Sequence, residues 1–231
     1  MKKTIVLFML LFSFVFSQNE EIYPITINEK FPDITLSTQD GDKVSLTDLR
    51  GKKVMLIFLR GRVTPTVWCP ICQYQYLEMV NLNEEENLKE RANMEIFFVL
   101  PYSSDTLDHW ISAFPKSLES IEKWKNPENA DSLSKGQIEW MEYAREFFPY
   151  SFDFSVNDFE ITLPILFDED RKVSKGLMLF KEEWGGTKVD QNIPTIFIID
   201  EKGYVKFKYL SQYTNDRPDA KYIKKYIEKM F

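Results

Sequence analysis

The two cysteines of this chain, Cys69 and Cys72, constrain what it can fold into more than any other feature. They follow a continuously apolar run, Val54 to Leu59, which is typical of a central β-strand covered on both faces. A loop over residues 60–68 separates that strand from the cysteines, and a helical pattern begins with them. The order strand, loop, Cys-x-x-Cys, helix predicts an α/β unit with both sulfurs at a helix N-terminus.

This placement makes the Cys-Pro-Ile-Cys segment suited to thiol redox chemistry. Backbone amides and the positive end of the helix dipole favour thiolate over thiol at Cys69, and the thiolate is the nucleophile. Cys72 lies one turn further on, close enough to resolve a mixed disulfide or a sulfenic acid as an internal disulfide. Pro70 suits the first helical turn, where its missing N–H has no intrahelical partner.

Three other interpretations of the cysteine pair are weaker. A structural disulfide that closes so short a loop restrains little of the unfolded chain. A zinc site needs about four ligands, and the only imidazole is His109, which we expect on a helix surface. Haem attachment requires histidine directly after the second cysteine, where the chain has Gln73. The pair therefore favours redox chemistry without a metal or another bound cofactor.

The N-terminus reads as a secretory signal peptide over residues 1–17. Lys2 and Lys3 precede an uncharged run from Thr4 to Phe16, and cleavage is expected before Gln18. That run is short against the roughly 20 residues that span a bilayer, and no later uncharged segment reaches that length either. We expect an exported protein, periplasmic or extracellular, with no membrane span after cleavage.

The charge and length of the chain limit the classes of protein to which it can belong. The chain has 231 residues and a formal net charge of −7, whereas a nucleic-acid surface needs a basic face. Hydrophobic residues make up 44% of it, which is ample for a packed core. We expect one redox domain over residues 18–231 and no nucleic-acid partner.

Strands alternate with helices along the rest of the chain, which predicts an α/β sheet with helices on its faces. The segments flanking Asp40-Gly41 predict an N-terminal β-hairpin, and a helix is expected from the cysteines to about Glu90. The further expected elements are strands at 95–100, 163–167, 195–199 and 204–210, and helices from about 104 and near the C-terminus.

Residues 115–157 do not fit this alternation and predict a helical insertion. Ser134 and Gln137 form a capping-box pattern, followed by apolar residues at helical spacing. The stretch is rich in aromatic residues. We expect them to fill a small satellite core, the alternative being a groove for a partner or substrate.

Several segments resemble known families. The run "VMLIFLRGRVTPTVWCPIC" resembles the active-site segment of the thioredoxin-fold superfamily, and "IPTIFIIDEKG" resembles the strand of that fold introduced by a cis-proline. The segments "FPDITLSTQDGDKVSLTDLRGKKV", "LPILFDEDRKVSKG" and "NDRPDAKYIKKYI" resemble the AhpC/TSA peroxiredoxin-like branch. The resemblance implies a thioredoxin-like fold, a central mixed sheet flanked by helices.

The resemblance also implies site residues. Cys69 is the attacking thiol and Cys72 the resolving one. Pro194, in cis, shapes the pocket. Thr66 stands at the threonine position of the peroxiredoxin motif Pro-x-x-x-Thr-x-x-Cys, but Arg62 replaces its proline.

Peroxiredoxins also carry an arginine where this chain has Pro194-Thr195, so Arg60 or Arg62 is expected to supply the positive charge. Trp68 is expected to pack beside the site and orient the loop. These departures favour disulfide exchange over peroxide reduction.

Three functions follow. The first is an exported thiol–disulfide oxidoreductase acting on protein disulfides and recycled by an upstream thiol reductant. The second is an antioxidant thiol peroxidase, in which a sulfenic acid on Cys69 condenses with Cys72. The third is a binding module in which the pair is a structural disulfide, so that Cys69→Ser behaves as wild type in any redox assay.

Overall fold

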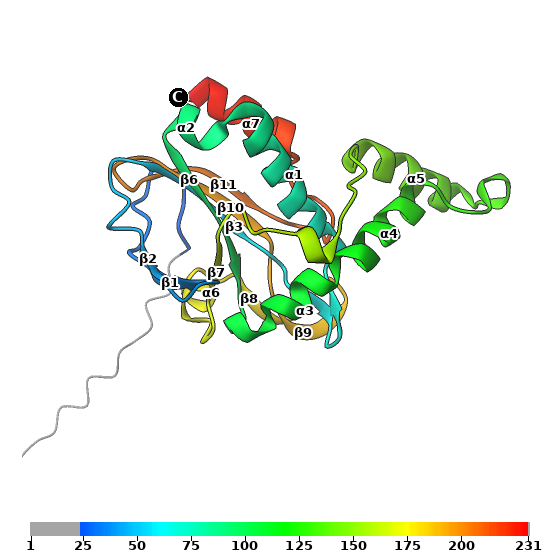
Figure 1. Cartoon of the computed structure of the whole chain (residues 1–231), viewed down its shortest axis with the longest axis horizontal. Coiled ribbons are helices and arrows are strands. Elements are labelled where there is room, and N and C mark those ends of the chain that lie inside the picture. The colour runs from blue at the N-terminus through cyan, green and yellow to red at the C-terminus, as the bar shows by residue number, and fades with distance from the viewer. Residues whose placement is uncertain (1–23, 231) are drawn as a thin grey trace, which may run out of the picture.

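The computed structural model describes residues 24–230, so the predicted signal peptide of residues 1–17 lies outside the described residues. A seven-stranded mixed sheet forms the centre of the molecule, with helices on its faces, as predicted (Figure 1). From edge to edge, the strands are β11 (Val205–Leu210), β10 (Thr195–Ile199), β3 (Lys53–Phe58), β6 (Met94–Leu100), β7 (Ile165–Phe167), β1 (Thr35–Thr38) and β2 (Lys43–Ser45).

The uninterrupted apolar run before the cysteines forms the middle of this sheet. β3 pairs parallel with β6 and antiparallel with β10, and every residue of β3 is buried. Because side chains alternate between the faces of a strand, Met55 and Ile57 join one core while Leu56 and Phe58 join the other.

Most helices pack on one face of the sheet, whereas the chain before β1 and residues 173–179 pack on the other. The first core receives side chains from α1 (Pro70–Glu86), α3 (Leu107–Ser112), α4 (Phe114–Lys125) and α7 (Ala220–Met230). The second core receives Phe31 from the N-terminal segment and Leu177 from the chain after α6 (Lys172–Gly176).

The helix that follows the cysteines is shorter than predicted. It was expected to run to about Glu90, but α1 ends at Glu86 because Asn87 adopts a left-handed φ of 48°. The short helix α2 (Leu88–Ala92) then continues the chain. Asparagine is among the few residues that visit this conformation readily, which explains the break.

The predicted insertion is helical. Residues 115–157 hold most of α4, then η2 (Ala130–Ser132), α5 (Lys135–Phe147) and η3 (Val156–Asp158). α5 reaches out beside α4 (Figure 1) and begins at the expected pattern, with the Ser134 N–H donating to Oε1 of Gln137 at 2.9 Å.

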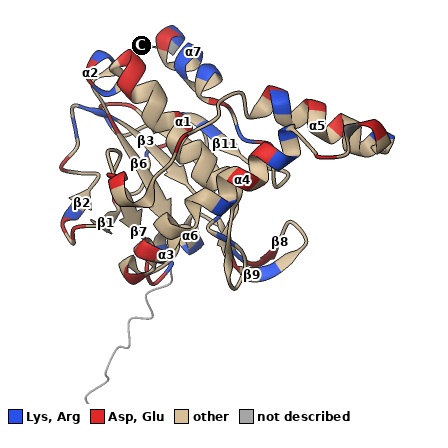
Figure 2. Cartoon of the chain, turned by 45° about the vertical axis from the view of Figure 1, so that its right-hand side comes forward, with Lys and Arg blue, Asp and Glu red and all other residues tan. Residues whose placement is uncertain are grey.

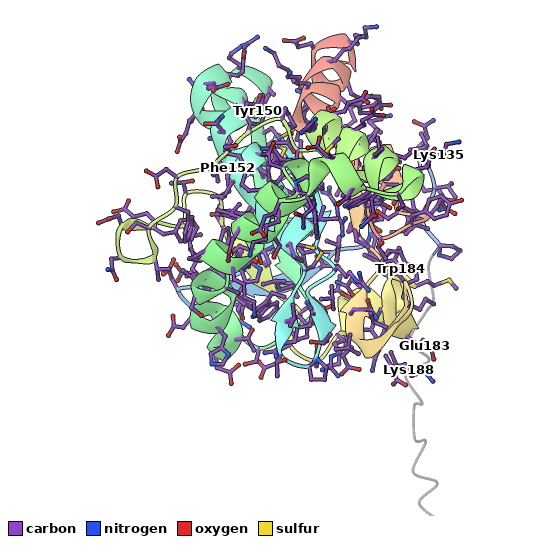
Figure 3. The ribbon with its side chains drawn as sticks, turned by 90° about the vertical axis from the view of Figure 1, so that its right-hand side faces the viewer. Lys135, Tyr150, Phe152, Glu183, Trp184 and Lys188 are labelled. Carbon is purple, nitrogen blue, oxygen red and sulfur yellow. The ribbon has the colours of Figure 1, made fainter. Side chains whose placement is uncertain are left out.

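Most of the aromatic residues of the insertion pack in or against the first core rather than in the separate satellite core that we expect. Phe148 is fully buried there. Tyr150 and Phe152, labelled in Figure 3, return the chain to α1: the Tyr150 N–H donates to the Tyr74 hydroxyl at 2.8 Å. The rings of Phe152 and Tyr74 meet edge to face, 5.2 Å apart. The insertion is therefore packed against the helix that carries Cys72.

Besides the predicted hairpin of β1 and β2, two hairpins lie outside the central sheet. They are β4 (Arg62–Thr64) with β5 (Val67–Trp68), and β8 (Phe180–Trp184) with β9 (Thr187–Asn192). An isolated bridge between Gly61 and Gln191 places β9 beside the loop that leads to the cysteines.

Candidate active site

Both cysteines lie where predicted, at the start of α1. Cys69 immediately precedes Pro70, the first helical residue, and its carbonyl accepts the N–H groups of Cys72 at 3.0 Å and Gln73 at 3.3 Å. Its own N–H donates to the Gly61 carbonyl at 2.8 Å. Both side chains are free thiols, with Cys69 2% exposed and Cys72 0% exposed.

The two thiols differ in acidity. Burial opposes ionisation of Cys69, but a hydrogen bond from Cys72 and the charges of Arg217 and Arg60 outweigh it and lower the Cys69 pKa to about 6. Burial and the adjacent Cys69 raise the pKa of Cys72 well above its ordinary value. Cys69 is therefore the thiol of the pair that ionises first, while Cys72 keeps its proton.

Arg217 is the main feature of the site that sequence reasoning missed. Its Nη2 lies 3.7 Å from the Sγ atoms of both cysteines, and the side chain is buried. Its Nη1 donates to the Thr214 carbonyl at 2.7 Å, within the same loop. This loop, residues 211–219, joins β11 to α7, and we call it the arginine loop. The one available signal was its place in the family-like segment "NDRPDAKYIKKYI".

Arg60 acts on the thiols through its charge rather than by a hydrogen bond. It is buried, and its Nε and Nη2 donate to Gln191 at 2.7 Å and to Thr187 Oγ1 at 2.8 Å. Its guanidinium also lies 5.1 Å from the ring centre of Trp184, labelled in Figure 3. Arg60 therefore holds the β8–β9 hairpin beside the site and lowers the pKa of Cys69 from a distance.

Trp68 and Arg62 shape the loop before the cysteines. Trp68 is buried, its ring meets Tyr102 edge to face at 5.3 Å, and the Arg62 guanidinium lies 4.6 Å from its ring centre. The Tyr102 hydroxyl accepts the Arg62 N–H at 2.9 Å and donates to the Asp190 carbonyl at 2.6 Å. A Cβ at Gly61, where φ is 86°, would collide with the Tyr102 ring. Tyr102 is a second site-shaping residue that the sequence did not reveal.

Thr66, at the threonine position of the peroxiredoxin motif, lies in the β4–β5 hairpin that precedes the cysteines. It stands exposed in the turn between β4 and β5. The extended residues of β5 follow it, so about 10 Å of chain separates its Cα from that of Cys69.

The expectation of a cis bond before Pro194 is wrong. No cis peptide bond occurs among residues 24–230, and the trans chain runs extended from β9 into β10. Pro194 is buried, and its carbonyl accepts the Ser211 N–H at 3.0 Å, which joins it to the start of the arginine loop. Thr195, the first residue of β10, is also buried and donates its hydroxyl to the Ile193 carbonyl at 3.0 Å.

The described part of the chain holds no cluster of three or more His, Cys, Asp or Glu side chains arranged to hold a metal. His109, which we expect to be a helix-surface or packing residue rather than a catalytic base, is exposed on α3. None of the helices within residues 24–230 is long and apolar enough to cross a membrane.

Solved structures similar to this chain include peroxiredoxins and a thiol peroxidase. The thiol peroxidase of Chromobacterium violaceum matches with a TM-score of 0.53 and 10% identity, covering 90% of each chain. A mutant of peroxiredoxin 6 from Arenicola marina matches at 0.51 and 16%, over 88% of this chain and 72% of that one. The reduced 2-Cys peroxiredoxin of Plasmodium vivax matches at 0.51 and 17%, over 89% and 81%. These likenesses establish the thioredoxin-like fold.

The sequence comparisons identify the family. No curated protein matches the sequence. The family model described as "AhpC/TSA family" matches residues 27–208, which include both cysteines and the strands on either side of them. The chain therefore belongs to the AhpC/TSA family and is a thiol-dependent oxidoreductase.

Proposed function

We propose that the protein is a thiol–disulfide oxidoreductase that cycles Cys69 and Cys72 between dithiol and disulfide. One observation carries this proposal: Cys69 directly precedes the first residue of α1, and Arg217 Nη2 lies 3.7 Å from both sulfurs. In this pair the pKa of Cys69 is lowered and that of Cys72 is raised. A nucleophile must be ionised and a resolving thiol must wait protonated until a mixed disulfide has formed. The opposite shifts support attack by Cys69 and resolution by Cys72.

The reaction balances without a cofactor. The Cys69 thiolate attacks one sulfur of a substrate disulfide, and the other substrate sulfur leaves as a thiolate that takes up a proton. Cys72 then loses its proton and attacks Cys69 Sγ, which releases the reduced substrate and leaves a Cys69–Cys72 disulfide. A separate thiol reductant restores the dithiol by the reverse exchange.

Peroxide reduction is the second candidate, and Arg217 favours it. The Arg217 side chain is buried, and its Nε has no hydrogen-bond partner within the described chain, so a donor is available for a small anion or oxygen. In that reaction the Cys69 thiolate attacks the O–O bond and becomes a sulfenic acid, and the leaving oxygen takes up a proton. Condensation with Cys72 then forms the disulfide and releases water. The exposed position of Thr66 counts against this candidate.

Stopped-flow tryptophan fluorescence separates the two candidates, because Trp68 precedes Cys69 directly. Reduced protein is mixed with hydrogen peroxide or with a protein disulfide such as insulin. Disulfide exchange predicts fast oxidation by the disulfide and a peroxide rate like that of free cysteine, both abolished by Cys69→Ser. A peroxide rate far above that of free cysteine would make peroxide the substrate. Wild-type behaviour of Cys69→Ser with both oxidants would leave only a binding module with a structural disulfide.

We also propose that this chemistry takes place after export, to the periplasm or outside the cell. The basis is the charged start and the uncharged run within residues 1–17. Mass spectrometry of the protein recovered from the extracytoplasmic fraction should find Gln18 at its N-terminus. Recovery of the uncleaved chain from the cytoplasm would reject export.

A further inference from the structure

The arginine loop covers a nucleophile that must be reached from outside. Cys69 is 2% exposed, and Arg217, itself 4% exposed, lies against both sulfurs. The loop contains no helix or strand between β11 and α7. Any substrate disulfide must displace part of this cover to contact the Cys69 Sγ.

A side chain of the insertion forms a hydrogen bond to the backbone in the middle of this loop. The hydroxyl of Tyr143, on α5, donates to the carbonyl of Asn215 at 2.8 Å. Asn215 follows Thr214, whose carbonyl holds the Arg217 guanidinium. A short series of contacts thus runs from α5 through the loop backbone to the cysteine sulfurs.

The Tyr143 hydroxyl is held in place before it meets the loop. Its ring stacks between those of Trp140 and Phe147, with centroids 5.4 and 5.2 Å away. α5 is in turn fixed to α4, where the Arg145 Nε donates to the Lys125 carbonyl at 2.7 Å. Acidic and basic residues are interspersed along α5 (Figure 2), and the labelled Lys135 marks its start (Figure 3).

We propose that Tyr143 is a positioning residue that holds the arginine loop closed over Cys69. The insertion then controls how often the nucleophile is exposed, through one hydrogen bond. This rests on the proposed function in that Cys69 is taken as the reacting thiol. A hydrogen bond of ordinary strength corresponds to roughly a three- to tenfold change in an equilibrium, and that is the change expected in the open fraction of the loop when the hydroxyl is removed.

The test is Tyr143→Phe, which keeps the stacked ring and removes the hydroxyl. Tyr226→Phe is the matched control, because its hydroxyl also donates to a backbone carbonyl, that of Lys206 at 2.6 Å, but between α7 and β11. Each protein is reduced and alkylated with iodoacetamide at pH 8, and mass spectrometry identifies the labelled cysteine. Tyr143→Phe should react at Cys69 roughly three to ten times faster than wild type, with Tyr226→Phe unchanged. Equal rates in wild type and Tyr143→Phe, or equal acceleration in both variants, would overturn the proposal.

Amide hydrogen exchange measures the opening of the arginine loop independently of thiol chemistry. Exchange in residues 211–219 should rise by a similar factor in Tyr143→Phe and not in Tyr226→Phe. Unchanged exchange refutes the role of Tyr143, whichever thiol reacts. Faster exchange with no labelling of Cys69 supports the role of Tyr143 in the loop and refutes the assignment of Cys69 as nucleophile.

Discussion

A buried carboxyl group on α1, the helix that carries Cys72, should make the protein less stable as pH rises. Glu78 lies on α1 and is 5% exposed, and its Oε1 has no hydrogen-bond partner within the described chain. Burial, with a smaller contribution from the charge of Asp219, raises its pKa to about 7, although the backbone of Ala220 at the start of α7 supplies one hydrogen bond. The fold therefore prefers Glu78 protonated.

The direction and size of this effect on the free energy of unfolding follow from the linkage between proton binding and folding. A carboxyl group with a raised pKa in the folded state costs nothing below its unfolded value, near 4.3, and costs progressively more as pH rises to about 7. Each pKa unit corresponds to about 1.4 kcal/mol, so ionisation costs on the order of 3 kcal/mol of unfolding free energy above pH 7. Glu78→Gln retains the volume and the acceptor for Ala220 but removes the charge. It should be about 3 kcal/mol more stable than wild type at pH 8 and nearly equal at pH 4.

Urea unfolding of the reduced proteins, followed by tryptophan fluorescence at several pH values from 4 to 8, measures this difference. Glu84→Gln is the control, because it removes an exposed glutamate from the same helix and should not reproduce the pH dependence. A difference between Glu78→Gln and wild type that stays constant over this range would refute the reasoning. So would a Glu78→Gln protein less stable than wild type at pH 8.

Three further predictions concern the site. Alkylation of Cys69 in wild type should accelerate as pH rises through about 6 and then level off, because only the thiolate reacts. In Arg217→Met the midpoint of this pH profile should rise by at least about one unit, towards the ordinary thiol value near 8.5. An unchanged midpoint would show that Arg217 does not lower the pKa of Cys69. Thr66→Val should change the oxidation rate less than about twofold, since the side chain is exposed, and a large loss with hydrogen peroxide as oxidant would instead support the peroxidase motif. Trp68→Phe should abolish most of the fluorescence change on oxidation while Cys69 still oxidises, as measured by thiol titration.

The parts of the fold that were predictable are those with strong local signals. The apolar runs at Val54–Leu59 and Thr195–Ile199 became the neighbouring strands β3 and β10, because a strand buried on both faces admits few polar residues. The capping pattern at Ser134 likewise located the start of α5. The β8–β9 hairpin was missed because its strands, Phe180–Trp184 and Thr187–Asn192, are mostly polar and only partly buried.

The residues of the site likewise fall into those that the sequence predicts and those that it does not. Cys69 and Cys72 were found because their spacing and their position before a helix carry chemical meaning by themselves. Arg217 was missed because it lies about 145 positions away in sequence, in a loop, and only tertiary packing brings it to the sulfurs. We expected Arg60 or Arg62 to supply the positive charge. The charge of Arg60 lowers the pKa of Cys69, but the guanidinium 3.7 Å from both sulfurs is that of Arg217, from another element.

The order of strands in the central sheet also bears on how the protein behaves at high concentration. β11 forms one edge, and an exposed edge strand is a template for pairing with another chain. Here the Val205 N–H donates to the Glu29 carbonyl at 2.9 Å, and its carbonyl accepts the Asn28 N–H at 2.7 Å. Lys206 and Lys208 extend over the same segment and donate to it. A second molecule would have to displace these residues before it could pair with the start of β11, so the chain's own N-terminal segment protects this part of the edge against aggregation.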